Sequence, residues 1–394
     1  MTVVSTGLWA FELDDAAGPP TQTFVTRRIR LADNRPVVHV CNRAGHYIGR
    51  LSGEVGAVAW RVDGYGTVSM RLSPGEAQKK SNLLAHGNPV RLEFANGLPA
   101  WGGVMDLPRE HTRDATRLSL YSAEYILGWT VAEEWASYIG DGNWDPDEIM
   151  TSMLIRSDAA DRYHINLEGG VWGQSPGKVV VDGRGDDLLT IAGSVRQKSP
   201  DFHWYIQAVT VWPPTTSLRF QLHQFYDYRR DRRMEVNLIE GHNFVNVEVV
   251  EQGPIYNHIT VTAGNYDPDD PQRRLFIAYY GEPIGNRRRE RFITMPEVIG
   301  SGLANEVVPI LRERAEAEYQ RYSQPRVRFR GYAINMPPAR FGTYEIGDVV
   351  NVTLNRYAAT GGVIPFLIIG MEFDPAQGLL TLVGEEIAEE KMRR

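Results

Sequence analysis

The sequence predicts a mainly β protein with α+β inserts, in which one small antiparallel module, a barrel or a sandwich, occurs twice. Two observations lead to this prediction. Apolar and polar residues alternate over many short segments separated by glycine and proline, as in strands with one buried face. A sequence pattern found near residue 90 also returns about 260 positions later, near residue 350.

Each copy of the repeat contains a turn glycine, an alternating strand, a return strand with glycine and methionine, and a third alternating strand ending in acid. The copies begin at Gly87 and Gly347, which should match each other, as should Gly103 and Gly370. Their apolar residues should be interior, because a slip of one residue would turn all of them to water. These residues are Val90, Leu92, Leu118, Leu120, Val350, Val352, Leu380 and Leu382.

Length and composition agree with a globular protein of several units. A chain of 394 residues is expected to form roughly two to four domains. The net charge of −7 provides no general affinity for nucleic acid or anionic membranes. Cys41 is the only cysteine, so no internal disulfide is expected, and its strand-like neighbours predict a buried, inert thiol. Neither a secretion signal nor a membrane helix is expected.

The chain begins with an N-terminal extension, residues 1–23, to which the sequence assigns no role. Residues 24–126 form the first module, since glycine and proline divide them into short alternating segments. One short helix is expected within 73–84.

An α+β insert is expected over 127–242. Asp145 and Pro146, followed by Glu148, form a helix start with a capping acid and a first-turn proline. A second helix should begin after Asp187, and an alternating hairpin over 202–222 should follow it.

The second module is expected in two pieces, 243–264 and 326–390. Between them, 265–325 forms a helix-containing insert with a stripe of apolar residues at helical spacing. Pro309 either begins that helix or bends it.

This order of units resembles the tail hub, or baseplate hub, proteins of tailed phages and related contractile injection machines. The likeness extends from about residue 24 to 387. It depends on four segments whose order is more specific than any one of them. These are 102–106 in the opening module, the helix and hairpin over 186–222, the strand 257–264, and the closing segment 344–352.

The resemblance implies that 24–126 is a first hub β-barrel and that 243–264 with 326–390 is a second. In that family the hub is a trimer whose six barrels form a ring of near sixfold symmetry. The implied partners are two further copies of the chain, a hexameric tail tube or distal tail protein, a tip, spike or fibre protein, and the tape measure protein. DNA would pass through the lumen without sequence-specific binding. The implied location is the tip or baseplate of the virion tail, after synthesis in the host cytoplasm.

Motifs for catalysis, metals and cofactors are absent from the sequence, so no site of these kinds is expected. The oxygen-bearing residues Asp141, Asn143, Asp145 and Asp147 alternate as in a calcium loop, but Pro146 and Ser152 occupy positions that need glycine and glutamate. Helix capping explains these residues better. The histidines lack the spacing of zinc ligands.

Two arginine clusters are candidate interface residues. A solvated loop is the simpler interpretation of each cluster, and pairing with acidic neighbours in an assembly is the functional one. The clusters are Arg229, Arg230, Arg232, Arg233 and Arg287, Arg288, Arg289, Arg291.

The sequence therefore favours a structural tail hub without enzymatic activity. Two alternatives stay open, a carbohydrate-active β-protein and a host-surface-binding module that uses exposed tryptophan and tyrosine. No pair of carboxylates can be assigned acid and nucleophile roles from the sequence.

Overall fold

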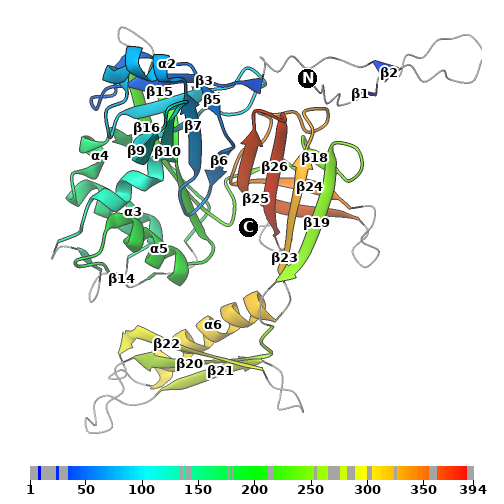
Figure 1. Cartoon of the computed structure of the whole chain (residues 1–394). Coiled ribbons are helices and arrows are strands. Elements are labelled where there is room, and N and C mark those ends of the chain that lie inside the picture. Colours follow the sequence, from blue (N-terminus) through cyan, green and yellow to red (C-terminus); the bar gives the residue numbers. More distant parts are fainter. Residues whose placement is uncertain are drawn as a thin grey trace, which may run out of the picture.

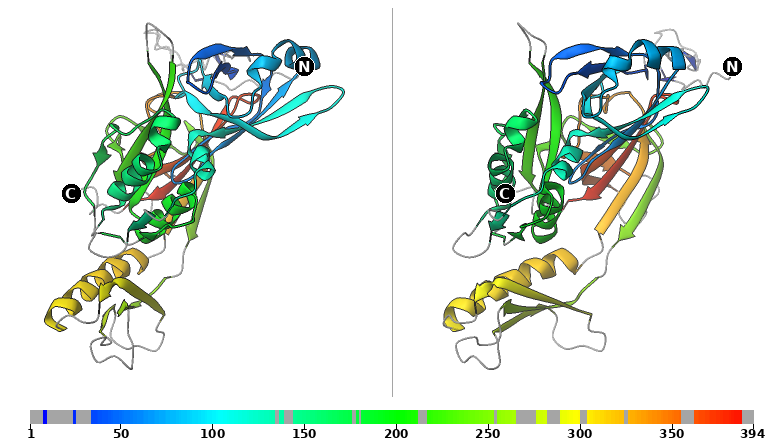
Figure 2. Two further views of the ribbon diagram at one scale, coloured as in Figure 1. Left: turned by 90° about the vertical axis from the view of Figure 1, so that its left-hand side faces the viewer. Right: turned by 60° about the vertical axis from the view of Figure 1, so that its left-hand side comes forward.

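The computed structural model contains two β-barrels, an α+β unit beside them and a smaller distal unit that stands apart (Figures 1 and 2). The mainly β class with two similar barrels and two inserts is confirmed. The described residues are 8–9, 24–25, 34–133, 136–138, 144–175, 178–179, 181–211, 217–252, 255–264, 276–281, 289–299, 304–323, 326–354 and 362–387.

The first barrel is a seven-stranded antiparallel sheet in the order β4-β3-β8-β9-β10-β7-β5. Its edge strands β4 and β5 follow each other in the chain, so a short link joins the two edges. Residues along β7 alternate between buried and exposed, which is the period of two that the sequence predicted. The strands are β3 (Val37–Cys41), β4 (Tyr47–Leu51), β5 (Glu54–Val55), β7 (Thr67–Leu72), β8 (Pro89–Glu93), β9 (Trp101–His111) and β10 (Thr116–Ser122).

Short helices flank this barrel. The helix expected within 73–84 is α2 (Pro74–Lys79), which the Ser73 hydroxyl caps by accepting a hydrogen bond from the Glu76 N–H at 3.2 Å. A 3₁₀ turn, η1 (Ser81–Leu83), follows it, and a second, η2 (Ala123–Trp129), leads out of β10.

The second barrel is an eight-stranded sheet whose main path is β17-β24-β25-β26-β23-β19. β18 lies beside β24, and β6 (Val58–Arg61), from the first half of the chain, pairs with β25. The strands are β17 (Arg230–Asp231), β18 (Asn237–Ile239), β19 (Phe244–Gln252), β23 (Arg326–Ala333), β24 (Asp348–Thr353), β25 (Val363–Asp374) and β26 (Leu379–Glu386).

The two barrels share a common part. The antiparallel order β8-β9-β10-β7-β5 in the first matches β24-β25-β26-β23-β19 in the second. Gly87 and Gly347 both have positive φ, +78° and +83°, a conformation that favours glycine. The eight apolar residues of the repeat are all buried, with at most 3% of each exposed, so this prediction is confirmed.

The copies differ in two details. Gly103 pairs with Ser122, but Gly370 pairs with Val383, which is one position short of the equivalent residue. The predicted match of the two glycines is wrong by one residue, because Met105 and Met371 are the residues that pair equivalently, with Leu120 and Leu382. A bulge lies in β25 between Ile368 and Gly370. In addition, β3 runs antiparallel to β8, whereas β17 and β18 run parallel to β24.

The α+β unit packs two helices against a four-stranded sheet. Both predicted helix starts are confirmed: α3 (Pro146–Arg156) has a capping box formed by Asp145 and Glu148, and Asp187 caps α5 (Leu188–Lys198). The sheet is built on a long antiparallel hairpin, β15 (Phe202–Val211) and β16 (Ser217–Tyr226). The other elements are β11 (Ser137–Tyr138), α4 (Ala159–Arg162), β12 (Ile165–Asn166), β13 (Val171–Trp172) and β14 (Val181–Asp182).

The distal unit is a three-stranded sheet, β21-β20-β22, with α6 packed on one face. Pro309 lies inside α6. The strands are β20 (His258–Gly264), β21 (Ile277–Gly281) and β22 (Glu290–Ile299), and α6 spans Ala304–Tyr322.

Three expected boundaries need correction. β6 lies within 24–126 but joins the second barrel, and β17 and β18 lie within 127–242 but also join it. β20 lies in the piece 243–264 that was expected in the second barrel, yet it pairs with β21 and β22 of the distal unit. Alternation reports that a strand has one buried face, but it does not report which sheet the strand joins.

The N-terminal extension is described only in part. β1 (Leu8–Trp9) pairs antiparallel with β2 (Phe24–Val25), and the other residues of 1–23 lie outside the described part of the chain.

Candidate functional site

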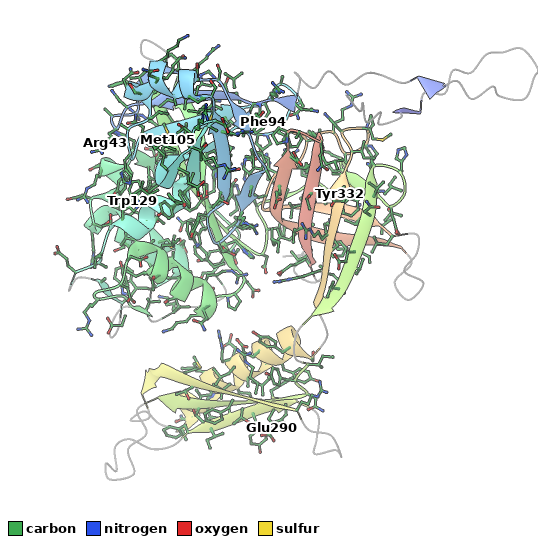
Figure 3. The ribbon with its side chains drawn as sticks, in the orientation of Figure 1. Arg43, Phe94, Met105, Trp129, Glu290 and Tyr332 are labelled. Carbon is green, nitrogen blue, oxygen red and sulfur yellow. The ribbon has the colours of Figure 1, made fainter. Side chains whose placement is uncertain are left out.

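The first barrel, the α+β unit and the second barrel meet at one junction, and most of the unusual polar groups lie there. Phe94, labelled in Figure 3, extends from the first barrel so that its ring centroid is 5.7 Å from that of Phe373 in the second. Its centroid is also 5.6 Å from that of Trp60 on β6. β6 belongs to the sheet of the second barrel although it comes from the first half of the chain, so this strand and one aromatic cluster connect the two barrels.

Arg229 and Arg230, two of the candidate interface residues, are paired within the chain at this junction. Arg229 Nη1 donates to Glu345 Oε2 at 2.5 Å. Arg230 donates through Nε and Nη2 to the two carboxylate oxygens of Asp348, at 2.8 Å each. Asp348 is fully buried, and burial raises its pKa although Arg230 opposes this effect. Bidentate pairs such as that of Arg230 with Asp348 are among the stronger hydrogen bonds in proteins, so these two guanidinium groups are engaged in contacts within the chain.

An aromatic stack from the α+β unit packs against Arg229. The guanidinium carbon lies 5.6 Å from the ring centroids of Trp172 and of Tyr205. His223 stacks on both rings, with centroid distances of 5.5 Å and 4.8 Å. Burial, reinforced by Arg229 and Arg230, lowers the pKa of His223 to about 3, so the ring is neutral near pH 7. The stack attaches the α+β unit to the second barrel by cation–π contact.

The other candidate arginines of the first cluster form local pairs. Arg232 pairs with Glu235 at 2.6 Å, and Arg233 pairs with Asp231 at 2.8 Å. All four side chains are partly exposed, and pairs of this kind contribute little to stability. The cluster is therefore neutralised by acids of the same chain.

The second candidate cluster lies on the distal unit. Arg291 faces α6, where its guanidinium carbon is 4.3 Å from the ring centroid of Tyr322 and its Nε is 3.7 Å from a Glu318 oxygen. The backbone N–H of Arg289 donates to Asn257 Oδ1 at 2.7 Å. Arg287 and Arg288 lie outside the described residues.

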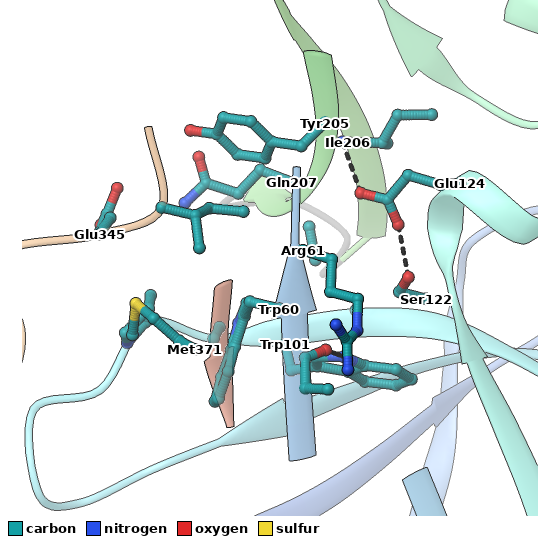
Figure 4. Close-up of a pocket in the computed structure, with 16 residues that line it drawn as sticks. Trp60, Arg61, Trp101, Ser122, Glu124, Tyr205, Ile206, Gln207, Glu345 and Met371 are labelled. Carbon is teal, nitrogen blue, oxygen red and sulfur yellow. Dashed lines mark hydrogen bonds between the residues drawn. The ribbon is translucent and has the colours of Figure 1, made fainter. Parts of the chain in front are cut away.

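A small cavity lies where the three units meet (Figure 4). Its volume is about 30 Å³, roughly enough for one or two water molecules. Each unit contributes to its lining: Trp60, Trp101 and Glu124 from the first half of the chain, Tyr205 and Ile206 from β15, and Glu345 and Met371 from the second barrel.

Glu124 is the buried acid of this cavity, with 3% of its surface exposed. Its Oε1 accepts from the Ile206 N–H at 2.7 Å, and its Oε2 accepts from the Ser122 hydroxyl at 2.5 Å (Figure 4). Burial raises the pKa of Glu124 to about 7, although both hydrogen bonds oppose this effect. Glu124 therefore connects η2 of the first barrel to β15 of the α+β unit by a contact that depends on protonation.

Asp63 makes the opposite kind of contact at the same junction. It has a φ of +60° and follows β6 closely, and it accepts from Arg196 Nε at 2.6 Å and from the Trp204 N–H at 3.0 Å. His203 Nδ1 lies 2.7 Å from its Oδ2. Burial alone would raise the pKa of Asp63, but His203 and Arg196 outweigh it and lower the pKa. Asp63 is thus held as a carboxylate between the segment that follows β6 and the α+β unit.

These groups stabilise the junction, and their chemistry is that of internal contacts. Among the described residues, no cluster of three or more histidine, cysteine, aspartate or glutamate side chains could hold a metal ion. Part of the acidic loop at 141–143 lies outside those residues, and Asp145 caps α3. The Cys41 thiol is buried, and burial raises its pKa to about 11. None of the described helices is long and apolar enough to cross a membrane.

The sequence did not single out Asp63, Glu124 or Asp348. Glu124 does carry one signal, since it is the acid that ends the third strand of the repeat, and Glu386 is its counterpart in the second copy. Glu386 is exposed, whereas Glu124 is buried by β15 of the α+β unit. The repeat therefore identifies the position of Glu124 in the sequence, but only the contact with β15 makes this acid buried.

The sequence matches no family model, and no curated protein is significantly similar to it. Solved structures of tail proteins do share its fold. The 43 kDa tail protein of prophage MuSo2 from Shewanella oneidensis has a TM-score of 0.53 and 11% identity, covering 91% of this chain and 99% of that one. A tail protein from Neisseria meningitidis MC58 has a TM-score of 0.55 and 10% identity, covering 90% and 97%.

A third similar structure is the prophage tail protein gp18 from Listeria monocytogenes EGD-e. Its TM-score is 0.54 at 12% identity, covering 89% of this chain and 94% of that chain. In each case the similarity covers about nine tenths of this chain. The fold resemblance to phage tail proteins that the sequence indicated is confirmed.

Proposed function

We propose that this chain is a structural tail hub protein of a tailed phage or a related injection machine. The observation that carries the proposal is the presence of two similar barrels in one chain whose whole fold is that of phage tail proteins. A body with threefold symmetry that meets a ring with sixfold symmetry needs two comparable surfaces in each chain. Duplication of the barrel supplies them.

In this proposal three copies form a homotrimer whose six barrels make one ring. The ring docks on the sixfold tail tube or distal tail protein, and the other end holds a threefold tip, spike or fibre protein. The assembly opens for DNA during ejection. The net charge of −7 suits a lumen that lets DNA pass without binding it. Contacts of Arg289 and Arg291 with acidic neighbours in the assembly remain a prediction.

The proposed role is noncatalytic. The buried acids of the junction support this, because Asp63 and Glu124 each bind the α+β unit and Asp348 binds Arg230 within the second barrel. Purified protein should not hydrolyse host cell wall, glycan or peptide substrates. Turnover that disappears when one aspartate or glutamate is replaced would contradict the structural role and favour the carbohydrate-active alternative.

The test of the hub role is the assembly itself. Light scattering and electron microscopy of the purified chain should give a trimer with a ring of six barrels, and the ring should bind a hexameric tail tube or distal tail protein. A twofold-symmetric or strictly monomeric protein at all concentrations would refute the symmetry-adaptor role.

A further inference from the structure

The sheet of the distal unit is covered on one face only. α6 packs on that face against Ile259, Val261 and Ala278. In Figures 1 and 2, α6 lies on the side of the sheet nearer the barrels, so the opposite face points away from the rest of the chain. That opposite face, called the open face here, carries the alternate residues of the three strands: His258, Thr260, Thr262, Ile277, Tyr279, Glu290, Phe292 and Thr294.

The open face exposes large apolar side chains in a row. Tyr279 and Phe292 both pair with Thr260, one from each neighbouring strand, so the two rings lie on either side of the central strand. Tyr279 is 68% exposed, Phe292 is 67% exposed, and Ile277 beside them is 44% exposed. The ring of His258 stacks on Tyr279 with a centroid distance of 5.8 Å. Exposed aromatic clusters of this kind are typical of protein interfaces.

The charge of the open face indicates what covers it. Glu290, labelled in Figure 3, is the only Asp, Glu, Lys or Arg among the described side chains of this face, and it lies at one end, where it pairs with His258. The chain as a whole has a net charge of −7, so two copies carry like net charge. A face whose centre is uncharged is where two copies can meet without juxtaposing like charges. A partner recognised through opposite charge, such as nucleic acid or a basic protein, would instead require charged residues there.

We propose that the open face is a contact surface between copies of this chain. This inference rests on the proposed homotrimer and adds to it the surface that holds the copies together. In a threefold assembly each distal unit turns its open face toward the common axis, and Tyr279 and Phe292 of one copy pack against the open face of the next. Threonine side chains around the rings complete a neutral, weakly polar contact.

The first test removes the rings and measures assembly of the full chain. Phe292→Thr and Tyr279→Thr keep strand propensity and change side chains that are exposed in the single chain, so each variant should fold with an unchanged circular dichroism spectrum. Each should raise the concentration of half-assembly about tenfold or more. Ile310→Thr is the matched control, because Ile310 is 49% exposed on α6, away from the open face. It should assemble as the unmodified chain does.

The second test measures proximity between copies. Thr260→Cys places a thiol at the centre of the open face, and Cys41 is buried, so a short bis-maleimide should link two copies through position 260. Glu313→Cys, on an exposed position of α6, should give no such product.

The outcomes separate the two proposals. If the unmodified chain is a trimer while Phe292→Thr and Tyr279→Thr assemble equally well and position 260 does not cross-link, another molecule covers the open face and this inference is wrong, although the hub role stands. If the unmodified chain is monomeric at every concentration, both are wrong.

Discussion

Protonation of Glu124 should control the stability of the junction between the first barrel and the α+β unit. The pKa of Glu124 is raised from 4.5 to about 7 by burial, so the folded protein binds a proton at this site more tightly than the unfolded chain does. The stabilisation is fully present below pH 4.5 and is lost as the pH rises through 7. A difference of about 2.5 pH units corresponds to about 3 kcal/mol.

The substitution Glu124→Gln isolates this effect. A neutral glutamine can accept from the Ile206 N–H through Oε1 and donate to the Ser122 hydroxyl oxygen, so it reproduces the protonated acid. The difference in unfolding free energy between the two proteins should therefore change by about 3 kcal/mol between pH 4.5 and pH 7 in favour of the variant. Urea denaturation followed by tryptophan fluorescence at a series of pH values measures it.

The control is Glu110→Gln, an exposed position on β9, whose curve should run parallel to that of the unmodified protein. Asp63 does not interfere, because its lowered pKa affects stability only below its ordinary value of 3.8. Parallel pH curves for Glu124→Gln and the unmodified protein between pH 4.5 and pH 7 would refute the assignment of a buried, protonatable acid.

Three further changes test other parts of the structure. Arg230→Ala leaves the buried Asp348 carboxylate without its bidentate partner and should destabilise the chain by about 3 kcal/mol in urea denaturation. Arg233→Ala removes an exposed ion pair and should cost less than about 1 kcal/mol. Equal losses for the two variants would contradict the difference in burial. Replacement of 253–325 by Asn-Gly should leave both barrels folded, because Gln252 and Arg326 are direct cross-strand partners that a two-residue turn can join. Loss of the strand signal in circular dichroism would show that the distal unit belongs to the main core. A chelator should leave the melting temperature unchanged, and a large decrease would restore the calcium interpretation of the acidic loop.

The sequence predicted those features of the fold that local patterns determine. The alternating residues of the repeat identified the interior of both barrels, from Val90 to Leu382, because a strand with one buried face must alternate. The helix starts at Asp145 and Asp187 were also predictable from local sequence, because a capping side chain binds the backbone of its own helix.

Features that depend on distant segments could not be predicted in this way. The pairing of β6 with β25 and of β20 with β22 leaves no mark on the alternation of either strand. The arginine cluster looked like a charged surface because the acids that neutralise Arg229 and Arg230 lie more than 110 positions away in sequence, at Glu345 and Asp348. Tertiary structure thus converts a candidate interface into an internal junction.

The unequal edges of the two barrels bear on how the proposed ring would close. The matched part of each barrel ends at β8 or β24, beyond which the first barrel adds the antiparallel strand β3 and the second adds the parallel strands β17 and β18. If six barrels form one ring, the matched strands can present six comparable surfaces to a sixfold partner. The added edges then differ between alternate barrels, so the ring is threefold in symmetry and only approximately sixfold. Equal affinity for all six positions of a tail tube therefore requires the docking surface to lie on the matched strands and not on the added ones.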